Sequence, residues 1–182
     1  MKAVLLDRDG VINEDRRDYV KNISEFVILP GVPEAIGELT RNGFAVFVLS
    51  NQAGISKGLY SSETLRDIDS CLQREVEKKG GKIAKTYYCP HQDEDNCSCR
   101  KPKPGMFERL FAEYPGIVDS ETYYVGDSRR DILAARKAGC RALLVLTGKA
   151  RREDAEEWAE KPDHVSEDLM EAARWIISRS ES

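Results

Sequence analysis

Short apolar runs alternate with amphipathic segments along most of this chain, and this alternation constrains the fold more than any other feature. The runs are rich in β-branched or aromatic residues, which is typical of buried strands. Strands are expected at residues 3–6, 44–49, 86–89, 123–125 and 142–146, with a short edge strand at 163–165. Helices are expected at residues 33–40, 62–79, 104–114, 130–138 and 167–178, where apolar residues recur every three or four positions.

Proline and glycine mark the ends of these expected helices. Pro33 and Pro104 fall near helix starts, whereas Gly43 and Gly139 fall just past helix ends, where a left-handed backbone is favoured. Strands joined through helices run parallel, and the crossovers cover both faces of the sheet. The sequence therefore predicts an α/β fold, a Rossmann-like three-layer sandwich with a mostly parallel central sheet, forming one domain over residues 1–182.

Charge and hydropathy exclude several classes of partner. The chain has 28 Lys and Arg against 32 Asp and Glu, a net charge of -4, which favours neither a nucleic-acid nor a membrane partner. The N-terminus lacks the pattern of a signal peptide, and no apolar stretch approaches the roughly 20 residues that span a bilayer. We expect a cytoplasmic monomer whose small anionic substrate binds in a locally positive pocket.

Two carboxylates follow the first expected strand directly. Asp7 and Asp9 leave an extended strand on the same side, where they repel each other and any anionic substrate unless a cation lies between them. The carboxyl ends of strands are also where open α/β sheets bind ligands. The pair therefore implies a metal ion, with a turn that closes the strand as the alternative.

Polar groups follow two further strands. Ser50, Asn51 and Gln52 come after the second strand, where a hydroxyl and backbone N–H groups suit phosphoryl oxygens. Asp127 follows the fourth strand, and its carboxylate is the expected third metal ligand beside Asp7 and Asp9. The alternative for each is a helix cap, an interpretation that weakens when three strand ends carry such groups together.

A basic segment, Arg100-Lys101-Pro102-Lys103-Pro104-Gly105, precedes the third crossover helix. Its two prolines stiffen the backbone, so a lysine here can be held in a fixed direction. A carboxylate that attacks a phosphate needs such fixed positive charge. The alternative is a solvated basic loop.

These residues together resemble the haloacid dehalogenase (HAD) superfamily of phosphatases, subfamily IIIA, between Lys2 and about Leu146. The four signature motifs occur in order: residues 7–11, Ser50, Lys101-Pro102, and Gly126-Asp127 with Asp131. The resemblance implies an enzyme that hydrolyses phosphate monoesters. The gaps between motifs leave no room for the cap domain that many members carry, so loops would select the substrate.

The resemblance also assigns roles to individual residues. Asp7 would attack phosphorus and become a phosphoaspartate, while Asp9 would protonate the leaving oxygen and then activate water. Magnesium would lie between the Asp7 side chain, the Asp9 backbone carbonyl and Asp127. Ser50 and Lys101 would contact the transferred phosphoryl group, and Asp131 would orient Lys101 or a metal-bound water.

A second group of potential ligands consists of Cys89, His91, Cys97 and Cys99. Three thiolates and one imidazole suit tetrahedral zinc and leave no position for water, so we expect a structural zinc in a loop at residues 89–99. Free thiols, or a strained Cys97–Cys99 disulfide, are the alternatives.

The zinc loop and the motif sequences narrow the resemblance to the D-glycero-D-manno-heptose 1,7-bisphosphate phosphatases. Such an enzyme would convert the bisphosphate to the heptose 1-phosphate. The segments that carry this likeness are residues 7–13, 19–20, 50–58 and 99–106. Histidinol-phosphate phosphatases share the same loop and core and are the alternative, whereas a nucleic-acid 3'-phosphatase or a non-catalytic module fits less well. The residues expected to contact substrate are Asn51, Gln52, Arg100, Lys57 and Tyr19. Lys57 is a candidate for a second phosphate or else a solvated lysine.

Overall fold

The computed structural model describes residues 1–180, so the last two residues of the expected domain, 181–182, lie outside the described residues. Its centre is a six-stranded sheet in which every pairing is parallel. The strand order is β3-β2-β1-β4-β5-β6. The strands are β1 (Ala3–Leu6), β2 (Ala45–Asn51), β3 (Ile83–Cys89), β4 (Tyr123–Gly126), β5 (Arg141–Val145) and β6 (His164–Ser166).

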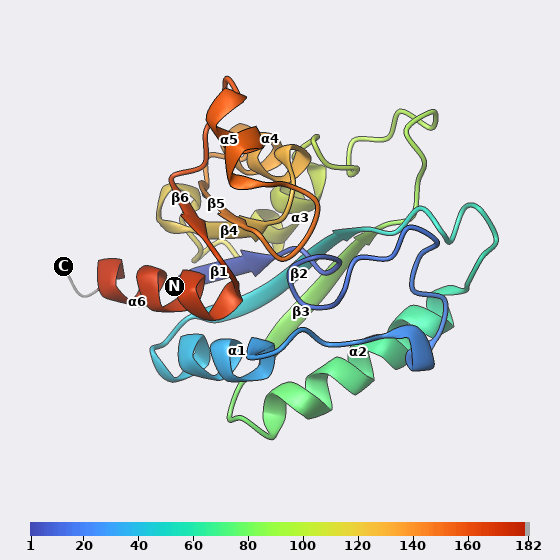
Figure 1. Ribbon diagram of the computed structural model, residues 1–182, viewed down its shortest axis with the longest axis horizontal. Helices are drawn as coiled ribbons and strands as arrows, with labels where there is room; N and C mark the ends of the chain where they lie inside the picture. Colours follow the sequence, from blue (N-terminus) through green and yellow to red (C-terminus); the bar gives the residue numbers. More distant parts are fainter. Residues whose placement is uncertain (181–182) are drawn as a thin grey trace.

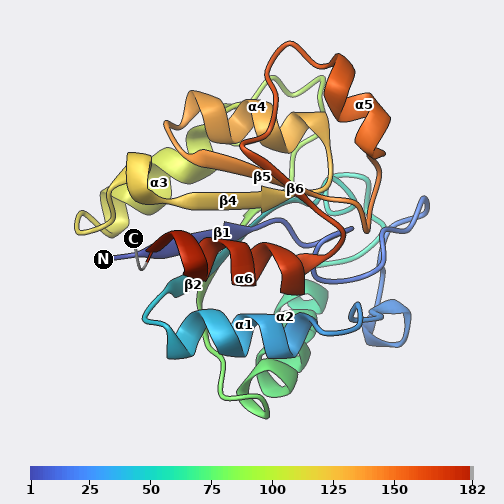
Figure 2. The same ribbon diagram turned by 60° about the vertical axis from the view of Figure 1, so that its left-hand side comes forward.

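Helices cover both faces of the sheet, as Figures 1 and 2 show. One face packs against α1, α2 and α6, and the other against α3, α4 and α5, so two separate apolar clusters form the core. The α/β three-layer prediction is confirmed. The helices are α1 (Val32–Arg41), α2 (Ser62–Glu77), α3 (Gly105–Glu113), α4 (Arg129–Lys137), α5 (Arg152–Glu157) and α6 (Leu169–Ser180), with 3-10 turns at Ile23–Glu25 and Asp119–Glu121.

Local sequence explains most helix boundaries. Pro33 lies in the first turn of α1, and Gly43 and Gly139 adopt positive φ angles of 81° and 78° after α1 and α4. Helix α5 was not predicted, because it has one buried residue, Ala155, and no apolar periodicity. The third strand begins at Ile83, earlier than expected, since its exposed and half-buried residues mask the apolar pattern.

The strand order shows at which end of the sheet a ligand site is expected. From β1 the chain moves outward through β2 and β3, then returns to the other side of β1 for β4, β5 and β6. Parallel sheets bind ligands at such a reversal point, beyond the carboxyl ends of the strands. The carboxyl ends of β1, β2 and β4 therefore form the expected site.

The described chain has no cap domain, as predicted. Within residues 1–180, the connection from β1 to α1 contains one 3-10 turn, and the connection from β2 to β3 contains α2 alone. Residues 14–21 form an irregular segment beside the carboxyl end of β1, which we call the flap. Across the same residues, no helix combines the length and the apolar character needed to cross a membrane.

Candidate active site

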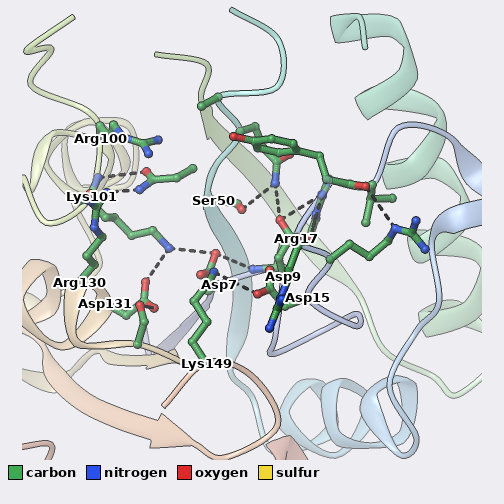
Figure 3. Close-up of a pocket in the computed structure, with 18 of the residues that line it drawn as sticks. Asp7, Asp9, Asp15, Arg17, Ser50, Arg100, Lys101, Arg130, Asp131 and Lys149 are labelled. Atoms are coloured by element: carbon green, nitrogen blue, oxygen red, sulfur yellow. Dashed lines mark hydrogen bonds and ion pairs between the residues drawn. The ribbon is translucent and has the colours of Figure 1, made fainter. Parts of the chain in front are cut away.

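A cavity of about 640 Å³ opens at the carboxyl ends of β1 and β2, as Figure 3 shows in close-up. Acidic side chains lie together in it, and basic side chains from the connections that follow β1, β3 and β5 and from the first turn of α4 line it around them. The predicted residues among its lining are Asp7, Asp9, Tyr19, Ser50, Asn51, Gln52, Arg100, Lys101 and Asp131. Folding thus brings most of the predicted phosphatase residues to one cavity, although Asp127 and Lys57 are not among its lining residues.

Asp7 continues the line of β1 into the cavity. Its backbone N–H donates to the Val125 carbonyl at 2.9 Å, which ties the residue to the neighbouring strand β4. The Asp7 Oδ1 atom accepts from the Arg8 N–H at 2.7 Å and lies 2.9 Å from the Lys101 Nζ atom. Burial raises the pKa of the Asp7 carboxyl to about 6, although the Lys101 charge opposes the shift.

Lys101 is buried, with 2 % of its side chain exposed, and three further oxygens besides Asp7 Oδ1 surround its ammonium group. Its Nζ atom donates to the Tyr124 hydroxyl at 2.6 Å and the Leu49 carbonyl at 3.0 Å, and lies 2.7 Å from Asp131 Oδ1. Burial disfavours its charge, but Asp131 and Asp7 outweigh burial and raise the pKa. The lysine is therefore a permanent cation aimed at Asp7.

Asn51 holds the backbone of the same lysine. Its side-chain oxygen accepts from the Lys101 N–H at 3.0 Å, and its side-chain nitrogen donates to the Lys101 carbonyl at 3.1 Å. Asn51 therefore joins the end of β2 to the basic segment. Both of its polar atoms are committed to protein partners, which favours a positioning role over the predicted substrate contact.

Asp131, in the first turn of α4, is committed to the same network. Its Oδ1 atom accepts from the Tyr124 hydroxyl at 3.1 Å, and its Oδ2 atom accepts from the Ser128 hydroxyl. Burial alone would raise the pKa of Asp131, but the neighbouring Lys101 charge lowers it below the usual value. This arrangement fits the prediction that Asp131 orients Lys101.

Asp127 lies at the end of β4, and backbone crowds around it. Its Oδ2 atom accepts from the Lys149 N–H at 2.8 Å, and a Cβ added at Gly10 would lie 2.4 Å from that oxygen. Its Oδ1 atom is buried and has no hydrogen-bond partner within residues 1–180. Burial raises the pKa of Asp127 to about 8, and the charges of Asp131 and Asp7 add to the shift.

These acids fit a magnesium site. One oxygen from each of Asp7, Asp127 and Asp131 lies within 4.8 Å of the others. Carboxylate oxygens are the ligands that Mg²⁺ prefers, and the unpartnered Asp127 Oδ1 is a buried oxygen that a cation would satisfy. Asp131 is held by Lys101, which agrees with its predicted supporting role.

Asp9 has a different environment from Asp7, although only one residue separates them. Its Oδ1 atom accepts from Asn13 Nδ2 and Arg8 Nη2, each at 2.9 Å, and its Oδ2 atom accepts from Gln52 Nε2 at 2.7 Å. Burial would raise the pKa of Asp9, but the Arg8 charge and these hydrogen bonds lower it. Asp9 is thus an ionised, fixed carboxylate beside the cavity.

Gln52 connects Asp9 to Ser50. Its Nε2 atom also donates to the Ser50 hydroxyl oxygen at 3.0 Å, and its Oε1 atom accepts from the Tyr60 hydroxyl at 2.6 Å. Gln52 is 1 % exposed, with both ends of its amide engaged. This geometry favours a positioning role for Gln52 over the predicted substrate contact, while the Ser50 hydroxyl lines the cavity.

Two arginines at the rim share one carboxylate. Asp93 lies 2.9 Å from Arg100 Nε and 3.0 Å from Arg130 Nη1, and Arg100 Nη1 also donates to the His91 carbonyl at 3.1 Å. Sequence reasoning missed Arg130, one residue before Asp131. It also missed Lys149, which lines the cavity and lies 3.4 Å from Asp15 of the flap. Their only sequence signal is a position just after a strand end.

Tyr19 and Lys57 meet at the edge of the cavity. The Lys57 Nζ atom donates to the Tyr19 hydroxyl at 2.8 Å and lies 5.2 Å from the centre of the tyrosine ring. Tyr19 lines the cavity, but Lys57 is not among its lining residues. In this arrangement Lys57 contacts the flap, and its predicted role toward a second phosphate stays a prediction.

The predicted zinc ligands converge on one point. The Cys99 sulfur lies 3.2 Å from the Cys89 sulfur and 3.5 Å from the Cys97 sulfur, and 3.4 Å from His91 Nδ1. Sulfur and imidazole ligands gathered around one point suit tetrahedral zinc. All three cysteines are free thiols, which argues against the disulfide alternative.

Comparison with known proteins gives the family. A family model described as HAD-hydrolase-like matches residues 98–172. D-glycero-beta-D-manno-heptose-1,7-bisphosphate 7-phosphatase from Neisseria meningitidis serogroup A is 40 % identical over 99 % of this chain and 97 % of its own length. The protein of the same name from Pseudomonas putida is 41 % identical over 97 % of this chain and 100 % of its own length.

The chain belongs to this phosphatase family. The solved D,D-heptose 1,7-bisphosphate phosphatase from Bordetella bronchiseptica, complexed with magnesium and phosphate, matches with a TM-score of 0.91 and 38 % identity, covering 98 % of this chain and 99 % of that one. The heptose-bisphosphatase family resemblance predicted from the motifs is confirmed. The individual site residues stay predictions.

The raised pKa of Asp127 makes the stability of the magnesium-free protein pH dependent. The folded state keeps a proton on Asp127 up to about pH 8, whereas the unfolded chain loses it near 3.8. The folded state therefore binds more protons at pH 6–7.5, and stability falls by about 1 kcal/mol per pH unit as pH rises. Urea unfolding of the dialysed protein should show this slope, and Asp127→Asn should reduce it strongly above pH 7, where Asp7, with a pKa of about 6, contributes little. An equal slope in both proteins would contradict the assignment.

Proposed function

We propose that this chain hydrolyses the 7-phosphate of D-glycero-β-D-manno-heptose 1,7-bisphosphate. The products are inorganic phosphate and the heptose 1-phosphate. The main support for this reaction is the position of Asp7. Its buried carboxylate lies at the cavity, 2.9 Å from the Lys101 ammonium and beside the unpartnered oxygen of Asp127. The names of the relatives support the substrate and do not favour histidinol phosphate, the alternative.

In the first step, an oxygen of Asp7 attacks phosphorus. A P–O bond to Asp7 forms, the P–O bond to the sugar C7 oxygen breaks, and Asp9 gives that oxygen a proton. The phosphate anion bound beside Asp9 raises the proton affinity of the carboxylate. Lys101 and the Ser50 hydroxyl contact the phosphoryl oxygens, where charge develops.

In the second step, water attacks the phosphorus of the phosphoaspartate. Asp9, now ionised, takes a proton from that water, the bond from phosphorus to Asp7 breaks, and inorganic phosphate leaves. The donors around Asp9 favour its ionised form, which suits this step. An acid two residues after the nucleophile thus serves both halves of the reaction.

The proposed magnesium ligands are the side chains of Asp7 and Asp127 and the backbone carbonyl of Asp9. When bound, Mg²⁺ supplies positive charge that offsets the repulsion between the Asp7 carboxylate and the substrate phosphate. Gly10 allows the first loop to approach Asp127 closely, since its φ angle is 85° and any side chain there would meet the carboxylate. Lys101 contributes the fixed cation on the other side of Asp7.

The distal part of the substrate is proposed to contact the rim. Arg100 and Arg130 line the cavity and meet at Asp93, and Arg17 lines the cavity from the flap. Guanidinium groups bind phosphate through paired N–H groups, so these arginines suit the phosphate on C1. The net charge of the chain is negative, but this rim is locally positive.

The zinc loop is proposed to hold this rim in place. Asp93 lies in the loop between His91 and Cys97, and Arg100 directly follows Cys99. A bound zinc would fix the loop, and with it the carboxylate that orients both arginines. On this proposal the zinc has a structural role.

The first test compares substrates. Phosphate release is measured with the β and α anomers of the heptose 1,7-bisphosphate, fructose 1,6-bisphosphate and histidinol phosphate, each with Mg²⁺. We expect the β-heptose bisphosphate to give the highest kcat/KM, and Asp7→Asn to reduce every rate to background because its amide is no nucleophile. A higher kcat/KM for histidinol phosphate would overturn the substrate, and retained turnover in Asp7→Asn would overturn the mechanism.

The second test removes a rim guanidinium. Arg100→Ala should raise KM for the heptose bisphosphate by about 10–100-fold, the range of one lost hydrogen bond to a charged group. Its kcat/KM for p-nitrophenyl phosphate, which has no distal phosphate, should change little. Arg109→Ala is the control, because Arg109 is an exposed arginine of α3 that is not among the residues lining the cavity. Equal losses on both substrates in Arg100→Ala would argue against a distal contact.

The third test concerns zinc. Elemental analysis of protein purified without added metal should find about one zinc per chain, since four ligands are available. Cys97→Ser should lose that zinc and lower the midpoint of thermal unfolding, whereas Cys71→Ser, outside the cluster, should keep the zinc. Unchanged metal content and stability in Cys97→Ser would rule out the structural zinc.

A further inference from the structure

Arg8 stands between the two reactive carboxylates in sequence, and its side chain is 1 % exposed. It is the largest of the fully buried side chains within residues 1–180. A buried charge is costly, and an apolar side chain of similar volume often stabilises a fold as well as a buried ion pair does. The burial of a guanidinium here therefore calls for a reason other than stability.

The guanidinium contacts Asp9 through two nitrogens. Nε lies 3.3 Å from Asp9 Oδ1, and Nη2 lies 2.9 Å from Oδ1 and 3.1 Å from Oδ2. A planar guanidinium that meets both carboxylate oxygens fixes the plane of the carboxylate as well as its position. A single ammonium group would fix position alone.

Two neutral donors complete the arrangement. Asn13 Nδ2 donates to Oδ1 at 2.9 Å, and Gln52 Nε2 donates to Oδ2 at 2.7 Å. Both residues are buried, and Gln52 is itself held by the Tyr60 hydroxyl. The side chain of Asp9 is 20 % exposed, so the carboxylate still reaches the cavity. Its direction is set by the buried donors of Arg8, Asn13 and Gln52.

We propose that Arg8 is the positioning residue for Asp9, holding its carboxylate in the plane from which it transfers a proton to the leaving oxygen. This inference rests on the proposed function, because it takes Asp9 to be the acid and base of the phosphatase reaction. Arg8 lines the cavity, but the nitrogens that make its hydrogen bonds to Asp9 are Nε and Nη2. On this proposal its effect on the reaction passes through the Asp9 carboxylate.

The test uses the leaving group. A sugar alkoxide needs a proton to leave, whereas p-nitrophenolate leaves without one, and kcat/KM reports the steps up to departure of the leaving group. For Arg8→Lys, we expect kcat/KM for the heptose bisphosphate to fall about 100-fold, within the range that general acid catalysis supplies, and that for p-nitrophenyl phosphate by less than about tenfold. Arg8→Met, which also loses the charge, should widen the difference.

Asp9→Asn and Leu39→Ala are the reference variants. Asp9→Asn should show the same selective loss as the Arg8 variants, while Leu39→Ala, a buried change in α1, should lower stability and leave the ratio of the two kcat/KM values unchanged. Equal losses on both substrates in Arg8→Lys would overturn the positioning role. If Asp9→Asn also lacks the selective loss, the proposed function of Asp9 fails as well, so the two failures are distinguishable.

Folding is checked by circular dichroism before the rates are compared. Arg8→Met removes the counter-charge of Asp9 and is the variant more prone to unfold. Arg8→Lys keeps a cation at the same position and carries the test by itself if Arg8→Met is unfolded. An unchanged ratio of the two kcat/KM values in folded Arg8→Lys would be sufficient to reject the proposal.

Discussion

The buried ion pair network centred on Lys101 is the interaction on which the rest of the site depends. Its ammonium joins Asp7 at the end of β1 with Asp131 in α4, and also contacts the Leu49 carbonyl in β2. One cation therefore connects the ends of β1 and β2 with the first turn of α4. Burial makes each missing partner costly, so the geometry of the network is strongly determined.

The site separates two carboxylates that are nearly adjacent in sequence. Asp7 faces Lys101 and the other acids, where burial raises its pKa, while Asp9 faces donors that lower its pKa. Pairs of acids in contrasting environments are a common means of dividing roles between a nucleophile and an acid or base. Here the division follows from the different partners that folding places around each carboxylate, Lys101 for Asp7 and Arg8 with Gln52 for Asp9.

The sequence predicted the structure best where the local backbone alone decides the position of a residue. Gly43 and Gly139 adopt the left-handed backbone expected after a helix. Asp7 shares one cavity with Ser50 and one acidic cluster with Asp127, because parallel strands end at the same edge. Agreement was weakest for side chains whose partners are distant. Asn51 and Gln52 line the cavity, and their predicted contact with substrate stays a prediction, but the sequence did not indicate that Lys101, Asp9 and Tyr60 would bond to their polar atoms.

The sequence by itself determined the sheet, the order of the motifs, the two groups of candidate metal ligands and the class of reaction. These depend on residue type and spacing, which local periodicity and ligand chemistry specify. The tertiary structure alone decided that Arg130 and Lys149 reach the cavity, that Lys57 meets Tyr19, and that Arg8 turns inward to Asp9. The reason is physical: the direction of a polar side chain depends on partners brought together by folding, and their separation along the chain can exceed forty residues, as for Gln52 and Asp9.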